Sequence, residues 1–156
     1  MAEKQALTGT YRLVSGEMQR NDGTVEFPFG KDAIGYLAYT EEGFIWFEIN
    51  AMNRTPFKGG DWFGTKDEND EAMKTHLSFF GRYKIEGDEL YYLILTSSSP
   101  NMVEMSKGGK FFYGAKARLN GKILRLISKP YVVDGVECQT QYVWEKIAEL
   151  GKTPAV

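Results

Sequence analysis

The chain is poor in the two residue types that most often act as metal ligands or nucleophile partners: its 156 residues include one cysteine and one histidine. Cys138 cannot form an internal disulfide, which fits a reducing compartment, and we expect it to be a buried strand residue that behaves as a small hydrophobe. A zinc site of the usual nitrogen and sulfur ligands is disfavoured. Any Ser-His or Cys-His nucleophile system would have to use His76.

Other absences exclude whole classes of function. The sequence has no Walker A motif and no G-x-G-x-x-G after a strand, so nothing in it predicts a nucleotide cofactor. The 19 basic and 21 acidic residues are mixed along the chain, without the block of lysine or arginine that marks a nucleic-acid surface. No apolar run approaches about 18 residues, and Met1–Gln5 has no apolar leader segment. We therefore expect a cytoplasmic protein that uses no metal or cofactor and binds neither nucleic acid nor membrane.

What the sequence has in quantity is aromatic residues, 14% of the chain, together with regularly spaced turn signals. Asn120-Gly121 is the clearest turn, because this pair supplies the positive φ angles of a type I′ hairpin. Segments rich in aromatic and β-branched residues lie between the turns and predict eight strands. The expected strands are Gly9–Arg20, Ile34–Thr40, Phe44–Met52, Phe79–Glu86, Glu89–Ser97, Lys110–Leu119, Lys122–Lys129 and Val136–Ile147.

The segment Thr65–His76 breaks the strand pattern, since its first half is acidic and its second half carries Ala72 and Met73. Acidic residues in a first turn complement the helix dipole, so we predict a short helix here. Eight strands joined by short turns favour closure, because an open sheet would leave two exposed edges. The predicted fold class is therefore all-β: a single domain over residues 1–156, built as a closed antiparallel up-and-down β-barrel with one short helix.

Six short segments occur in a recognisable order: Leu7–Ser15, Pro28–Asp32, Gly35–Thr40, Gly81–Tyr83, Ser99–Asn101 and Val143–Glu145. In sequence and spacing they resemble the small intracellular lipocalin-like domain family of bacteria and fungi. The resemblance covers Leu7 to about Lys146 and implies a calycin-type, lipocalin-like barrel that is closed at one end. Related barrels include cofactor-free cyclases and isomerases as well as carriers, so the resemblance does not give a reaction.

The strand Phe44–Met52 has two candidate inner faces. They are Ile45, Phe47 and Ile49 on one side and Phe44, Trp46, Glu48 and Asn50 on the other. If the first face is inside, Trp46 and Glu48 lie outside, where charged residues normally are. If the second is inside, Trp46 is a stacking wall, Glu48 an acid or base and Asn50 a hydrogen-bonding group. Arg82 on the next strand is then the candidate partner of Glu48, or else a solvated outer-face residue.

His76 lies near the end of the predicted helix. If that helix is a lid over the barrel mouth, His76 is placed to shuttle a proton. The alternative is an exposed histidine that complements the helix dipole. The strand Glu89–Ser97 is apolar on both faces, which implies that its outside is covered by a helix, a loop or a second subunit, and a homodimer is one expectation.

These residues give a candidate site for a small hydrophobic molecule in the barrel. The candidate catalytic residues are Glu48, His76 and Arg82. The candidate substrate-binding residues are Tyr36, Trp46, Asn50, Phe79, Tyr83, Tyr92, Asn101, Tyr113 and Trp144. The favoured hypothesis is a cofactor-independent isomerase or cyclase acting on a polyketide- or terpenoid-like molecule. The alternatives are a non-catalytic carrier or sensor of such a ligand, and a filled barrel whose outer face binds protein.

Overall fold

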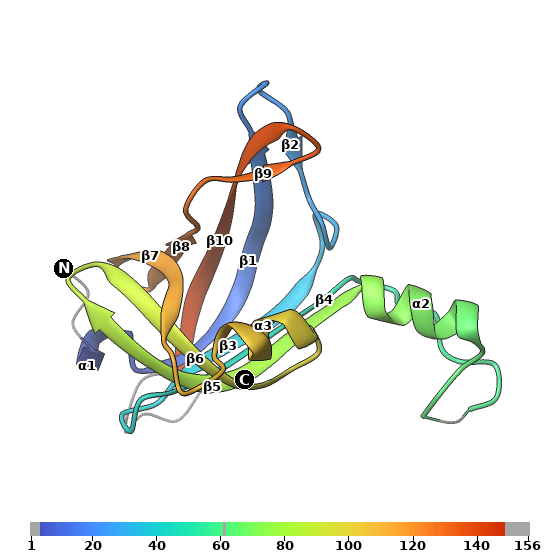
Figure 1. The fold of residues 1–156 in the computed structure, drawn as a ribbon, viewed down its shortest axis with the longest axis horizontal. Coiled ribbons are helices and arrows are strands. Elements are labelled where there is room, and N and C mark those ends of the chain that lie inside the picture. The colour runs from blue at the N-terminus through green and yellow to red at the C-terminus, as the bar shows by residue number, and fades with distance from the viewer. Residues whose placement is uncertain (1–3, 61, 149–156) are drawn as a thin grey trace.

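The computed structural model describes residues 4–60 and 62–148, and strands dominate this part of the chain (Figure 1). The helices are α1 (Lys4–Leu7), α2 (Lys66–Lys74) and α3 (Pro100–Met105). The strands are β1 (Gly9–Arg20), β2 (Val25–Glu26), β3 (Ile34–Tyr39), β4 (Phe44–Asn50), β5 (His76–Glu86), β6 (Glu89–Ser97), β7 (Phe112–Asn120), β8 (Ile123–Ile127), β9 (Tyr131–Val133) and β10 (Val136–Ala148).

Eight of these strands close a barrel. They follow the order β1-β3-β4-β5-β6-β7-β8-β10 with antiparallel neighbours, and β10 pairs with β1 to complete the ring. The short strands β2 and β9 pair with the far ends of β1 and β10, which form a long ribbon that rises beyond the barrel (Figure 1). The predicted closed antiparallel barrel is confirmed, and each of the eight predicted strands agrees with an observed one to within three residues at either end.

Alternation along the strands decides which side chains fill the barrel. On β4, Ile45, Phe47 and Ile49 are buried, whereas Trp46 is 56% exposed. The first of the two candidate faces is therefore the inner one. Tyr11 on β1 and Trp144 on β10 are fully buried in the same core. Each such large side chain contributes about 1.5–3 kcal/mol by leaving water, which makes the opposite register costly.

Helix α2 forms where the sequence predicts it but does not cover the barrel. The Thr65 hydroxyl accepts a hydrogen bond from the Glu68 backbone N–H, and the Glu68 carboxylate accepts one from the Thr65 N–H, which is a capping box. The helix buries none of its residues and projects away from the barrel (Figure 1). Of the alternatives for this helix, a lid over the barrel mouth is therefore excluded.

A second prediction that needs correction is the number of helices. Besides α2, the described residues include α1 and α3, and α3 packs against β6. Pro100 starts α3, where its fixed φ and missing N–H suit a first helical turn. Among the described helices, none is long and apolar enough to cross a membrane. Cys138 is 1% exposed, as expected for a buried strand residue.

Candidate functional site

A cavity of about 170 Å³ lies inside the barrel, beside α3. Its wall is formed by side chains of six consecutive barrel strands, from β4 round to β10, and by one residue of α3. The residues that give the wall its character are Phe47, Phe79, Tyr92, Met102, Phe112 and Tyr142. The cavity is thus bounded mainly by aromatic rings and by one flexible methionine.

Small residues on β7 leave this space open. Gly114 and Ala115 both line the cavity although they are neighbours in sequence. The pairing of β6 with β7 shifts register between Leu90 and Tyr91, and this bulge turns two successive β7 residues toward the interior. The rings on the facing strands therefore have no large side chain opposite them at this level.

The aromatic wall is fixed by ring-to-ring packing. Phe47 and Phe79 are stacked, with centroids 4.6 Å apart and ring planes 10° apart. Tyr142 meets the Phe47 ring edge-on at 5.6 Å, and Tyr92 lies 5.8 Å from Phe79. Such contacts add about 0.5–1.5 kcal/mol each beyond simple burial. The wall is consequently preorganised to receive a flat apolar group.

A few polar groups reach the cavity or lie beside it. Burial raises the pKa of Tyr142 to about 12, so its hydroxyl stays protonated at neutral pH. The Tyr92 hydroxyl lies 3.0 Å from the Tyr39 hydroxyl, and burial raises the pKa of both. Tyr142 is therefore a neutral phenol in the cavity wall.

Trp144 lies next to this wall, 5.4 Å from Phe47 and 6.3 Å from Tyr142 between ring centroids. It is fully buried, and its indole Nε1–H has no hydrogen-bond partner in the part of the chain that the structure describes. A buried donor left unpaired costs about 1–3 kcal/mol. A buried water molecule that bridges this N–H to an acceptor would remove this cost.

Helix α3 is held at the side of the cavity by two serines. The Ser97 Oγ lies 3.6 Å from Met102 Sδ, and the buried Ser106 hydroxyl accepts the Ile94 backbone N–H at 2.7 Å. Gly108 and Gly109 follow with positive φ angles, in a short turn that leads back to β7. These contacts place Met102 against the cavity and make α3 the element that would have to move to enlarge it.

The structure places four of the predicted binding residues inside the barrel. Phe79 and Tyr92 line the cavity itself. Tyr83 and Trp144 are buried in the surrounding core but do not line it, and the Tyr83 hydroxyl donates to the Thr40 carbonyl.

Four other predicted binding residues lie elsewhere, and their assignment to the cavity is wrong. Tyr36 and Trp46 are 48% and 56% exposed, because they alternate with the buried residues of β3 and β4. Tyr113 faces outward against Tyr91, since the β6–β7 bulge gives the inner positions to its two neighbours. Asn101 is exposed on α3, and the next residue, Met102, faces the cavity instead.

Three further candidates meet on the outer face. Glu48, Asn50 and His76 lie where β4 ends and β5 begins, with Asn50 directly opposite His76 in the ladder. Asn50 Nδ2 donates to Glu48 Oε1 at 3.0 Å, and His76 Nδ1 lies 2.8 Å from Asn50 Oδ1. Glu48, Asn50 and His76 thus form one cluster on the outer face. None of them lines the barrel cavity.

Arg82 does not join this cluster. It is paired with Phe44, four residues before Glu48, and its guanidinium lies over the Phe44 ring at 5.8 Å. The proposed Glu48–Arg82 partnership is wrong because the β4–β5 register keeps the two residues apart.

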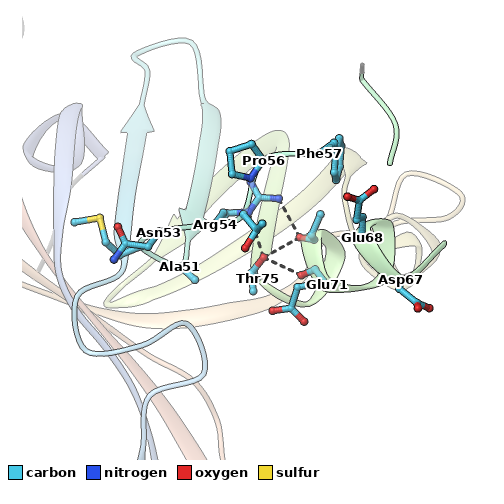
Figure 2. A pocket seen from close by; sticks show the side chains of 12 residues that line it. Ala51, Asn53, Arg54, Pro56, Phe57, Asp67, Glu68, Glu71 and Thr75 are labelled. Carbon is cyan, nitrogen blue, oxygen red and sulfur yellow. Dashed lines mark hydrogen bonds between the residues drawn. The ribbon is translucent and has the colours of Figure 1, made fainter. Parts of the chain in front are cut away.

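A larger groove of about 730 Å³ lies outside the barrel, between α2 and the segment that follows β4 (Figure 2). Arg54 crosses it and donates to the Ala72 carbonyl at 3.0 Å and to the Thr75 hydroxyl at 3.2 Å. The residues from Met52 to Pro56 that form one side are exposed. Arg54 thus serves to tie α2 to the barrel, and the cavity lined by aromatic rings is the better binding site for an apolar molecule. Within the described residues, no three His, Cys, Asp or Glu side chains lie close enough together to hold a metal ion.

The sequence model of the lipocalin-like domain family matches residues 8–147. The chain belongs to this family. No curated protein matches it significantly. Two solved structures are similar to this lipocalin-like barrel, each with 20% sequence identity, a TM-score of 0.41 and 90% of this chain covered. One is a lipocalin-like protein from Bacteroides uniformis, 97% of which is covered, and the other an uncharacterized protein from Bacteroides eggerthii, 98% of which is covered.

Sequence reasoning missed several cavity residues of this lipocalin-like barrel. Phe112 and Tyr142 are inner residues of strands that were predicted, but the sequence does not show where the β6–β7 bulge falls. Met102 was missed because α3 was not predicted, although Pro100 is a usable helix-start signal. For Phe47 the signal was present, since its face of β4 carries no charge.

Proposed function

We propose that this lipocalin-like barrel binds one small, mostly apolar molecule about the size of a single ring. The observation that carries the proposal is the 170 Å³ cavity inside the barrel, which is lined mainly by aromatic rings. An engineered apolar cavity of about 150 Å³ holds benzene, whereas sites for larger ligands measure about 300–1,000 Å³. A polyketide- or terpenoid-like molecule with fused rings would need α3 to move outward first.

The polar groups at the wall suggest what the ring carries. Tyr142 offers a neutral phenol donor, so an acceptor such as a carbonyl, hydroxyl or ether oxygen on the ring complements it. Ser128 and Thr140 lie at the same cavity, and the Ser128 hydroxyl already accepts the Thr140 backbone N–H at 2.9 Å. A ring with one oxygen acceptor therefore matches this site better than a pure hydrocarbon or a charged molecule.

Binding without conversion, as by a carrier or sensor, is the function that this wall supports best. The cavity-lining residues include no carboxylate, lysine or histidine. A cofactor-independent isomerase or cyclase is the second candidate, supported by Tyr142, because a neutral phenol can stabilise an enolate that forms on a bound carbonyl compound. We also propose that the protein works in the cytoplasm and forms a homodimer. The single buried thiol of Cys138 agrees with a reducing compartment. The exposed Trp46 and Leu95 on the outer face agree with a contact between two subunits.

The test compares two neighbouring residues of α3. Met102 faces the cavity, whereas Val103 is 37% exposed on the same helix. We expect the wild type to bind a single-ring phenol such as 4-ethylphenol at least about tenfold more tightly than 2-naphthol, measured by calorimetry. Met102→Trp should abolish binding by filling the cavity, and Val103→Trp should leave it unchanged. Equal affinity for both probes, or binding that survives Met102→Trp, would contradict the proposal.

Product analysis then separates the two candidates. A cyclic enone with a single ring is incubated with the wild type and with Tyr142→Phe. Catalysis is supported if the wild type isomerises the enone and Tyr142→Phe binds it without isomerising it. The interaction removed by this change would then act mainly in the transition state. Tight binding without any product favours the carrier.

A further inference from the structure

A serine completes the cluster on the outer face of β4 and β5. Ser78 lies two residues after His76 on β5, so both side chains are on the same face, and Ser78 is paired with Glu48 across the ladder. The Ser78 Oγ lies 3.1 Å from His76 Nε2, and Asn50 Oδ1 lies 2.8 Å from His76 Nδ1. The imidazole thus bridges a hydroxyl and an amide oxygen.

The neighbours of Asn50 fix the direction of these hydrogen bonds. Asn50 Nδ2 donates to the Glu48 carboxylate, which can only accept, and Asn50 Oδ1 accepts from Arg54 Nη1 at 3.0 Å, which can only donate. The amide oxygen therefore faces His76, and Nδ1 carries the proton. Nε2 is left with its lone pair toward Ser78, so the Ser78 hydroxyl donates to it.

The surroundings keep the imidazole neutral and its serine in place. Burial and the Arg54 guanidinium lower the pKa of His76, while the Glu48 carboxylate opposes them. The backbone of Ser78 is held by the end of β6 and the residue after it, because its N–H donates to the Ser98 hydroxyl at 2.9 Å and its carbonyl accepts from the Ser97 hydroxyl at 2.9 Å. A neutral, oriented base next to a fixed hydroxyl is the arrangement of an activated nucleophile.

A groove of about 590 Å³ runs beside this hydroxyl. Trp46 and Phe80 form its apolar part, Ser78, Thr96, Ser97 and Ser98 supply hydroxyls, and the Glu48 carboxylate lies at the same groove. Trp46 is 56% exposed and Phe80 36% exposed, although both are large aromatic residues. An apolar group that packs against these rings would hold an attached carbonyl group close to Ser78.

We propose that Ser78 is the nucleophile of a second site, on the outside of the barrel, that takes small apolar or aryl esters, with His76 as base and Asn50 as a positioning residue. Ser78 Oγ attacks the ester carbonyl carbon as its proton moves to His76 Nε2. The C–O bond to the alcohol then breaks, and the alcohol leaves with that proton. Water attacks the acyl-serine by the same route, which releases the carboxylic acid and restores Ser78. This chemistry is independent of ligand binding in the barrel cavity.

The test is covalent labelling of the intact protein with p-nitrophenyl acetate and with a fluorophosphonate, followed by peptide mass mapping. We expect the adduct of each reagent on Ser78 in the wild type. His76→Gln should slow labelling by at least about 10²-fold, the usual contribution of a general base. Asn50→Ala should slow it less, and Asn50→Asp combined with Glu48→Gln should restore it, because this pair keeps an acceptor for His76 Nδ1–H and a hydrogen bond between positions 48 and 50. A merely structural role would not predict this recovery.

Ser15→Ala, on β1 and remote from His76, is the matched control and should label like the wild type. Unchanged circular dichroism shows that each variant is folded. An adduct spread over lysine and tyrosine residues without enrichment at Ser78 would overturn the proposal, and so would equal labelling rates in the wild type and His76→Gln. Because the labelled residue is mapped in the wild type, this result can contradict the proposal even if a variant fails to fold.

Discussion

The Tyr92 ring packs so closely against Gly114 that no side chain fits at position 114. A Cβ built on Gly114 would overlap the Tyr92 ring and lie 2.9 Å from its Cζ atom. Both residues line the cavity, and Tyr92 is held from behind by the Tyr39 hydroxyl at 3.0 Å. The width of the cavity at this level therefore depends on the absence of a side chain at position 114.

Gly114→Ala should force the Tyr92 ring into the cavity. We expect a loss of about 1–3 kcal/mol in the free energy of unfolding, as for other overpacked cores, together with weaker binding of a single-ring phenol. Urea unfolding and calorimetry measure the two effects. If the ring is the cause, Gly114→Ala combined with Tyr92→Leu should cost less than the sum of the single changes. An additive double variant would contradict this explanation.

The two faces of β4 can be compared at adjacent positions. Phe47→Ala removes a 4% exposed ring that stacks on Phe79, and should lower the free energy of unfolding by about 3–5 kcal/mol. Trp46→Ala removes a larger but 56% exposed side chain, and should cost at most about 1 kcal/mol. Chemical denaturation of both variants checks the assignment. A larger loss for Trp46→Ala would mean that the inner and outer faces are reversed.

Buried tyrosines should make the barrel sensitive to alkali. Burial raises the pKa of Tyr142 to about 12, above the unfolded value of about 10, so the unfolded chain releases its proton first as the pH rises. The stabilisation is fully present below about pH 10 and is lost between about pH 10 and 12. Unfolding measured by circular dichroism across this range should show it, with a shallower dependence in Tyr142→Phe. Equal slopes in the wild type and the variant would refute the assignment.

The capping box of α2 should act locally. Thr65→Ala removes the hydroxyl that accepts the Glu68 N–H and should weaken the helix by about 1 kcal/mol. Because α2 buries no residue, the barrel's own unfolding should hardly change. Hydrogen exchange within residues 66–74 should accelerate severalfold while exchange in β4 and β5 stays the same. Lys66→Ala, at the first helical position, is the control and should leave exchange unaltered.

The elements that sequence reasoning predicted well are those with local physical causes. β1 and β6 agree with their predicted bounds, and α2 begins after Thr65 as the capping signals indicate. Tyr113 and Met102 show where such reasoning ends. A one-residue bulge between β6 and β7 reverses the faces near Tyr113, and a six-residue helix supplies Met102. Neither event leaves a strong trace in composition or periodicity.

The sequence by itself therefore determined the strands, the turns and the helix that projects from the barrel, because backbone preference and turn chemistry act over a few neighbouring residues. Only the tertiary structure decided which face of each strand points inward, which helix lies against the cavity, and that Asn50, His76 and Ser78 meet. Alternation with a period of two offers two equivalent faces for a strand such as β4. Strand pairing and ring closure remove that equivalence, since they decide which set of side chains must share one interior.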